Sequence, residues 1–170
     1  MIKTRLLYFS LVGMLLSFAV LRSIDGELQK GKSEYGIVGF ELSHDSDTAN
    51  AIVGYWTEND KLGQAFFSLG FDYLFILFYV AFLALWTSLM AGKFYSAIWR
   101  NIAYAIILLF ILAGLLDAVE NYSLMKFLNN ADGGYWLIIA FYCASIKFGL
   151  IGLGALYNLG VLIGQKTIRV

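Results

Sequence analysis

The chain contains no proline, and it contains a single cysteine and a single histidine. Without proline, no long helix has to kink or stop because a backbone N–H is missing. Cys143 has no second cysteine with which to form an intramolecular disulfide, and no CxxC pair is present. These absences exclude a thiol–disulfide enzyme and a cysteine-based zinc site, and they favour long, unbroken helices.

Charge is also scarce, and its two signs cancel. Only 14% of the 170 residues are charged, 60% are hydrophobic, and the mean hydropathy is +0.73. Water is a poor solvent for such a chain, whereas a bilayer is a suitable one. The 12 basic and 12 acidic residues give no reason to expect nucleic acid as a partner.

Four apolar segments are long enough to cross a bilayer, at about residues 6–22, 66–91, 101–127 and 135–164. We therefore predict an all-α membrane protein, a single domain over residues 1–170 that forms a four-transmembrane-helix bundle. The first segment could instead be a signal peptide, because Lys3 and Arg5 precede it and residues 17–19 (Ser-Phe-Ala) weakly resemble a cleavage site. Its removal would leave three spans, so we favour four.

The basic residues predict the orientation in the cell membrane. The segments before the first span, between the second and third, and after the fourth carry no acid and six basic residues: Lys3, Arg5, Lys93, Arg100, Lys166 and Arg169. Residues 22–64 carry four basic and eight acidic residues. By the positive-inside rule, both termini are expected in the cytoplasm and the long loop, residues 23–65, outside it.

The long loop has patterns of its own. Residues 36–42 alternate as in a short strand or hairpin arm, and Asp47 or Thr48 could cap a helix that runs to Trp56. This helix has an apolar face, so we expect it on the outer membrane surface or across the top of the bundle. An ordinary amphipathic cap without a ligand is the simpler interpretation.

Polar residues inside the spans meet at a similar depth. Asp117, Glu120 and Asn121 share one helical face, and Asp117 lies roughly 25 Å along the third span from its cytoplasmic end. Asp72 lies about 9 Å below the outer boundary of the second span. Lys147 lies roughly 18 Å below the outer end of the fourth, but its long stem can extend upward. One cation can therefore face several acids.

Two interpretations of this group stay open. Asp72, Asp117 or Glu120 could pair with Lys147 and fix the register of the helices, since ionised groups at this depth normally pair. Alternatively, the acids outnumber the lysine and form an outward-facing pocket for a proton, a cation or a polar head group. Tyr79 is deep enough to donate a hydrogen bond within such a pocket.

Residues of the long loop are candidates for a lid over this pocket: Glu41, His44 and Trp56. A metal held by Glu41, His44 and a deeper acid is only weakly supported, because one histidine among scattered carboxylates is no metal motif. We predict no metal and name no cofactor. Asn158 is most simply an interhelical hydrogen-bonding residue. Close packing within the bundle or with a second subunit is favoured by a pattern of small residues in the fourth span: Ser145, Gly149 and Gly152 on one side, and Gly160 and Gly164 in GxxxG spacing.

Several short motifs resemble those of a family of small bacterial four-helix membrane proteins of uncharacterised function. They are GFEL at residues 39–42, GYW at 54–56, FDYLF at 71–75 followed by Tyr79, and DAVEN at 117–121. The resemblance covers nearly the whole chain, and its most specific elements are the aspartate of FDYLF and the DxxEN block. It implies a similar four-span fold and brings no reaction or cofactor.

Three functions are compatible with these patterns. The first is a binding or accessory protein for a lipid head group, a cation or a membrane partner. The second is a membrane enzyme acting on a lipid or other amphiphile, with Asp117 or Glu120 as general base and Lys147 as electrostatic stabiliser. The third is a proton or ion carrier that uses the same acids. We rank them in that order, with the bilayer as one partner and a homo-oligomer or larger membrane complex as another expectation.

Overall fold

The computed structural model describes residues 2–29, 35–92, 96–129 and 134–167. Residues 165–167 are described by their backbone alone. These residues contain no strand and form the helices α1 (Ile2–Leu28), α2 (Ile37–Glu41), α3 (Ser46–Glu58), α4 (Leu62–Ala91), α5 (Ala97–Asn129) and α6 (Gly134–Thr167). Four helices, α1, α4, α5 and α6, are long and apolar enough to cross a membrane. This confirms the prediction of an all-helical chain with four such helices.

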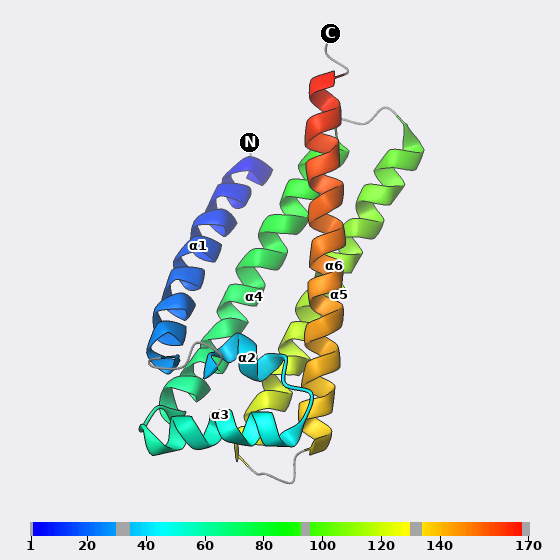
Figure 1. The fold of residues 1–170 in the computed structure, drawn as a ribbon. Helices are drawn as coiled ribbons and strands as arrows, with labels where there is room; N and C mark the ends of the chain where they lie inside the picture. The colour runs from blue at the N-terminus through cyan, green and yellow to red at the C-terminus, as the bar shows by residue number, and fades with distance from the viewer. Residues whose placement is uncertain (1, 30–34, 93–95, 130–133, 168–170) are drawn as a thin grey trace.

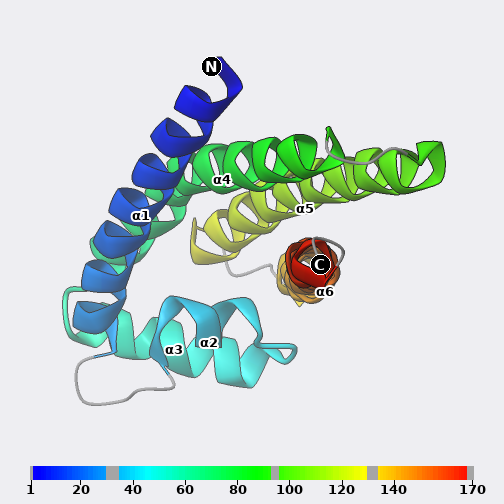
Figure 2. The same ribbon diagram turned by 90° about the horizontal axis from the view of Figure 1, so that it is seen from above.

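The four long helices run in alternating directions, with both chain ends at one end of the bundle and with α2 and α3 at the other (Figure 1). α1 packs along α4, α4 along α5, and α5 along α6. The described residues of α1 and α6 form no comparable interface, and the view along the bundle shows these two helices apart (Figure 2). The bundle is therefore an open row of helices rather than a closed ring.

α1 extends beyond the predicted first span, through Leu28. In its last turns, Arg22 Nη1 donates a hydrogen bond to Asp25 Oδ2 at 2.7 Å, and Leu28 is fully buried against the rest of the protein. Along its length α1 contacts α4 through aromatic pairs, Phe9 with Phe78 and Phe18 with Phe75. Residues 17–19, which resemble a cleavage site, lie within this continuous helix.

The prediction of a strand at residues 36–42 is wrong, because residues 37–41 form the short helix α2. Ile37, Phe40 and Glu41 are buried, which is the i, i+3, i+4 spacing of a helical face. The backbone N–H of Ile37 donates to Asp25 Oδ1 at 2.8 Å, so a side chain of α1 caps α2. This cap comes from a residue 12 positions earlier in the chain, so local pattern alone does not show it.

The cap of α3 also differs from the prediction. Asp45, rather than Asp47 or Thr48, is the N-cap residue, and its Oδ1 accepts from the backbone N–H of Thr48 at 2.7 Å. A carboxylate at this position satisfies one of the first N–H groups of the helix, which otherwise lack an intrahelical partner.

α2 and α3 pack across the end of the bundle through a hydrophobic core that they share with all four long helices. Trp56 is fully buried there, and its Nε1 donates to the backbone oxygen of Tyr35 at 2.9 Å. The ring of Phe40 lies 5.2 Å from that of Trp56 and 5.8 Å from that of Phe127 of α5. Trp56, a predicted lid residue, is therefore a core residue that packs against α2.

Close approaches between the long helices occur at glycines outside the predicted small-residue pattern. A Cβ atom on Gly114 would collide with Val80 of α4, and one on Gly154 with the ring of Phe110 of α5. A Cβ atom on Gly149, Gly152, Gly160 or Gly164 of α6 would meet nothing within 4 Å. The predicted hydrogen bond of Asn158 is confirmed, since Thr87 Oγ1 of α4 donates to Asn158 Oδ1 at 3.0 Å.

Candidate functional site

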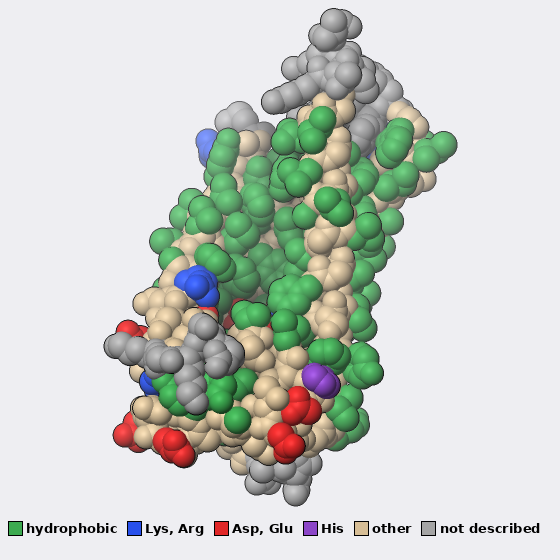
Figure 3. All heavy atoms as spheres, viewed as in Figure 1, with side chains coloured by type: hydrophobic (Ala, Val, Ile, Leu, Met, Phe, Trp, Pro, Cys, Tyr) green, Lys and Arg blue, Asp and Glu red, His purple; other side chains and the backbone are tan. Residues whose placement is uncertain are grey.

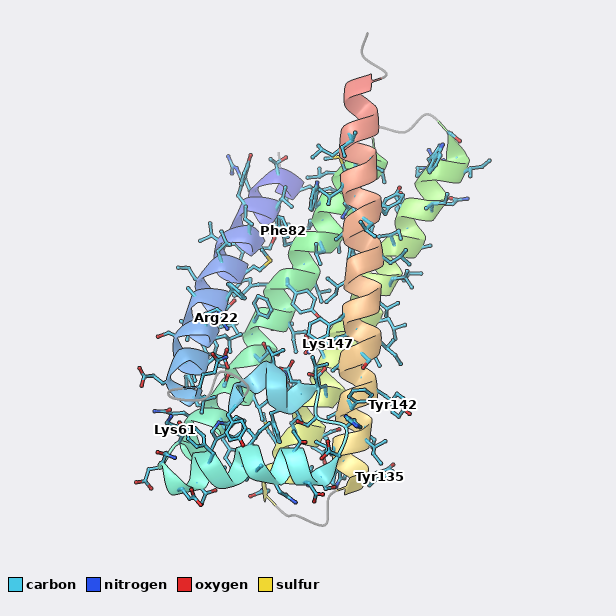
Figure 4. All side chains as sticks on the ribbon, in the orientation of Figure 1. Arg22, Lys61, Phe82, Tyr135, Tyr142 and Lys147 are labelled. Carbon is cyan, nitrogen blue, oxygen red and sulfur yellow. The ribbon has the colours of Figure 1, made fainter. Side chains whose placement is uncertain are left out.

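Lys147 of α6 is the centre of a buried charged cluster. Its Nζ donates to Asp117 Oδ1 at 2.7 Å and to Glu120 Oε1 at 2.8 Å, both on α5. Glu41 Oε2, from α2, lies 3.8 Å from the same nitrogen. All four side chains are buried, and Figure 4 shows Lys147 directed from α6 into the bundle. Helices α2, α5 and α6 thus meet at one ammonium group.

Tyr79 extends this cluster to α4. Its hydroxyl donates to Asp117 Oδ2 at 3.0 Å, so both oxygens of Asp117 are engaged. The hydroxyl of Tyr73 instead donates to the backbone oxygen of Ala118 at 3.1 Å. Tyr142 is exposed and points away from the bundle (Figure 4). Of these three tyrosines, Tyr79 is therefore the one that reaches the charged cluster.

Asp72 does not join Lys147. Its Oδ2 accepts from Asn121 Nδ2 at 2.6 Å, which joins α4 to α5. Among the described residues, no basic side chain forms an ion pair with Asp72, whereas Asp117, Glu120 and Glu41 all lie within 4 Å of the Lys147 nitrogen. Of the acids predicted at this depth, Asp72 is the one that the lysine leaves without a cation.

Glu41 is outside the membrane-spanning segments, and its pKa is raised to about 7. Burial is the main cause, and the negative charges of Asp72 and Asp117 add to it, while the nearby Lys147 opposes it. Glu120 Oε2 is buried without a hydrogen-bond partner among the other described side chains, and a hydrogen bond to Glu41 would satisfy it. With this pKa, the Glu41 carboxyl can hold a proton near neutral pH.

A cavity of about 450 Å³ lies beside the cluster. Its polar end is formed by side chains from all five neighbouring helices, namely Arg22, Asp25, Glu41, Ser68, Asp72, Tyr79, Asp117, Asn121 and Lys147. Its apolar wall comes from α1, α4 and α6, and includes Met14, Phe18, Phe82, Leu83, Phe148 and Ile151. Glu120 is not among the lining residues. The cavity therefore combines a polar end with a longer apolar wall.

The cavity lies where α1 and α6 fail to pack against each other. Residues of both helices line it, and Figure 3 shows a hollow between them that is walled by hydrophobic side chains, with acidic side chains visible at its lower end. α2 closes the polar end, since Ile37, Val38 and Glu41 line the cavity there.

Arg22, Asp25 and Ser68 line the cavity but were not predicted. On α1 the lining residues are Met14, Phe18, Leu21 and Asp25, spaced by three or four residues along one face, and Arg22, which is next to Leu21. The prediction ended the first span at residue 22, which placed Asp25 in a loop. Had the helical spacing been continued, it would have placed Asp25 on the same face as Met14 and Phe18.

His44 does not reach the cavity. Its side chain is 75% exposed, and its Nδ1 lies 3.9 Å from Asp45 Oδ2. Of the three predicted lid residues, only Glu41 contacts the cluster. Within the described ranges, no group of three or more His, Cys, Asp and Glu side chains is arranged to hold a metal ion.

Comparisons of the chain with protein-family models, with curated proteins and with solved structures found no match. The resemblance to small bacterial four-helix membrane proteins therefore stays a prediction.

Proposed function

We propose that the chain is an integral membrane protein that binds one amphiphilic molecule in the cavity between α1 and α6. The observation that carries this proposal is the cavity itself, which joins a polar end to an apolar wall. Its volume of about 450 Å³ is within the range of small-molecule sites. A polar group would bind near Asp72, Glu41 and Asn121, with the apolar part along α1, α4 and α6.

Access from the bilayer supports an amphiphilic ligand over a water-soluble one. α1 and α6 are the two ends of the helix row, and their described residues form no extended interface. A lipid-like molecule could enter sideways between them without leaving the membrane. Its apolar chain would replace lipid contacts by contacts with Phe18, Phe82 and Ile151 at little change in hydration.

The alternatives fit the geometry less well. Both oxygens of Asp117 accept hydrogen bonds, and Glu120 does not line the cavity, so neither is well placed as a general base toward a ligand there. A proton carrier needs polar groups along the bundle. Beyond Tyr79, however, the cavity wall continues with the apolar residues Phe82 and Leu83.

We further infer that the end of the bundle with α2 and α3 faces outward and that both termini are cytoplasmic. Lys3, Arg5 and Arg100 belong to the end that carries the termini, as the positive-inside rule requires for the cytoplasmic side. The polar end of the cavity would then lie near the outer surface of the membrane.

The test is to fill the cavity and to measure what the protein retains. Ile151→Trp places a large side chain at the apolar wall, whereas Leu153→Trp places the same side chain on the exposed side of α6. Lipid extraction and native mass spectrometry of the purified proteins should show a bound amphiphile in the unmodified protein and in Leu153→Trp. Ile151→Trp should lose it.

Equal retention in the two variants would place the amphiphile elsewhere on the protein. If neither the unmodified protein nor Leu153→Trp retains an amphiphile, and none binds when added, the proposed function is wrong.

A further inference from the structure

The polar end of the cavity contains two cations, and both are already neutralised. Lys147 is hydrogen-bonded to Asp117 and Glu120 and lies near Glu41. Arg22 is paired with Asp25 at 2.7 Å. The cavity therefore offers no unpaired basic side chain, among its described lining residues, to a phosphate, sulfate or carboxylate group.

Hydrogen-bond acceptors are available at the same end. Asp72 lines the cavity, and one of its oxygens, Oδ2, accepts from Asn121 Nδ2 at 2.6 Å. An ionised carboxylate can only accept hydrogen bonds, so the NH₂ end of the amide faces Asp72 and the amide oxygen faces elsewhere.

That amide oxygen is the second, independent feature of the site. Asn121 is only 1% exposed, it lines the cavity, and its Oδ1 has no hydrogen-bond partner among the described residues. A buried polar atom without a partner is unfavourable, and most such atoms in folded proteins have a partner. A small turn of the enclosed amide would bring this oxygen to a donor in the cavity.

We propose that Asp72 and Asn121 bind a protonated amine, so that the bound amphiphile carries a primary or secondary ammonium group. This inference rests on the proposed function and names its ligand class. The ammonium supplies the positive charge that Asp72 lacks and an N–H for an Asp72 oxygen, and a second N–H can meet Asn121 Oδ1 once the amide has turned. A quaternary ammonium has the charge but no N–H, and an alcohol has a donor but no charge.

The apolar part of such a ligand has a continuous path from this site. Asp72, Phe75, Tyr79, Phe82 and Leu83 line the cavity at helical spacing along one face of α4. Asp72 and Leu83 are separated by roughly 16 Å along the helix axis. A dodecyl chain anchored by its amine at Asp72 could extend along this face toward the apolar wall.

The experiment compares dodecyl probes that differ only in their head group: dodecylamine, dodecyltrimethylammonium and dodecanol. Native mass spectrometry titrations in a maltoside detergent give their apparent dissociation constants. We expect dodecylamine to bind roughly tenfold or more tightly than either of the others, because only it supplies both charge and N–H donors. Ethylamine and sodium ions, tested at the same concentrations, should not displace it.

The matched variant is Asp72→Asn, with Asp47→Asn as the control at an exposed site on α3. Partition of each probe into micelles is the same for all proteins and cancels from ratios between them. Asp72→Asn should weaken dodecylamine binding roughly tenfold and leave dodecanol binding unchanged, whereas Asp47→Asn should change neither. If Asp72→Asn does not give a monodisperse protein, the three probes on the unmodified protein decide the question alone, after each apparent dissociation constant is corrected for the measured partition of that probe into the micelles.

Failure of this inference differs from failure of the proposed function. If all three probes bind equally well, the cavity binds amphiphiles but the amine assignment is wrong. Displacement of dodecylamine by ethylamine or sodium ions would identify a site for small cations instead. If no probe binds, both the amine assignment and the proposed amphiphile site are overturned.

Discussion

At the scale of single residues, the buried cluster depends on a proton as well as on a lysine. Three carboxyl groups, those of Glu41, Asp117 and Glu120, lie within 4 Å of Lys147 Nζ. One ammonium cannot neutralise three buried carboxylates, and an uncompensated buried charge is strongly unfavourable. Glu41, with a pKa of about 7, is the acid of this cluster outside the spans, and it can hold a proton near neutral pH.

This arrangement predicts a pH dependence of stability. Since the pKa of Glu41 rises from 4.5 to about 7 on folding, the folded protein keeps a proton that the unfolded chain releases. The free energy of unfolding should therefore fall as pH rises between these values, by at most about 3 kcal/mol from this residue. Four other charged groups face Glu41, namely Lys147, Asp72, Asp117 and Glu120. The measured change of the unfolding free energy with pH includes their contributions.

Glu41→Gln isolates the contribution of Glu41, because glutamine keeps the shape but cannot ionise. In detergent, the Tm of Glu41→Gln relative to that of the unmodified protein should rise from about pH 5 to about pH 8. Glu58→Gln, at an exposed position on α3, should follow the unmodified protein throughout. Parallel curves for Glu41→Gln and the unmodified protein would contradict a raised pKa at Glu41.

At the scale of helices, the sequence predicts the spans well because bilayer thickness imposes a minimum length on each apolar run. α2 was mispredicted because five residues are too few to distinguish a helical from a strand period, and because its cap, Asp25, comes from a different helix. The shared face of Asp117, Glu120 and Asn121 follows from spacing alone. That Asn121, and not Lys147, meets Asp72 depends on how the helices rotate against their neighbours, which spacing does not give.

Helix contacts at glycine give a prediction for α6. Gly154→Ala would push a Cβ atom into the ring of Phe110, a rigid neighbour that is itself fully buried on α5. Overpacking of this kind usually destabilises by about 1–3 kcal/mol. Gly152→Ala, two residues away, meets nothing within 4 Å and should be neutral or slightly stabilising.

Thermal unfolding of both purified variants in the same detergent measures the difference. We expect a lower Tm for Gly154→Ala alone. An unchanged Tm for Gly154→Ala would mean that α5 and α6 pack less closely at Phe110 than the structure has them.

At the scale of the whole molecule, α2 and α3 bridge one end of the open row of helices and so enclose one end of the cavity. Asp25 of α1 bonds to α2, while α2 contacts α6 and α3 contacts α4 and α6. The row is thus bridged at the end that holds the polar residues and stays open between α1 and α6 along the rest of the cavity. Such an arrangement suits a ligand whose polar group is enclosed while its apolar part remains next to lipid.

The side on which this bridged end lies decides from which leaflet a ligand would enter. Asp47 on α3 and Ser96 just before α5 are both exposed, and they lie at opposite ends of the bundle (Figure 1). In a Cys143→Ser background, Asp47→Cys should react with a membrane-impermeant maleimide in intact bacterial cells. Ser96→Cys should react only after the cells are lysed, because Arg100 and the other basic residues of its end favour the cytoplasm. The reverse pattern would place α2, α3 and the polar end of the cavity at the cytoplasmic leaflet. The amphiphile would then have to enter from that side.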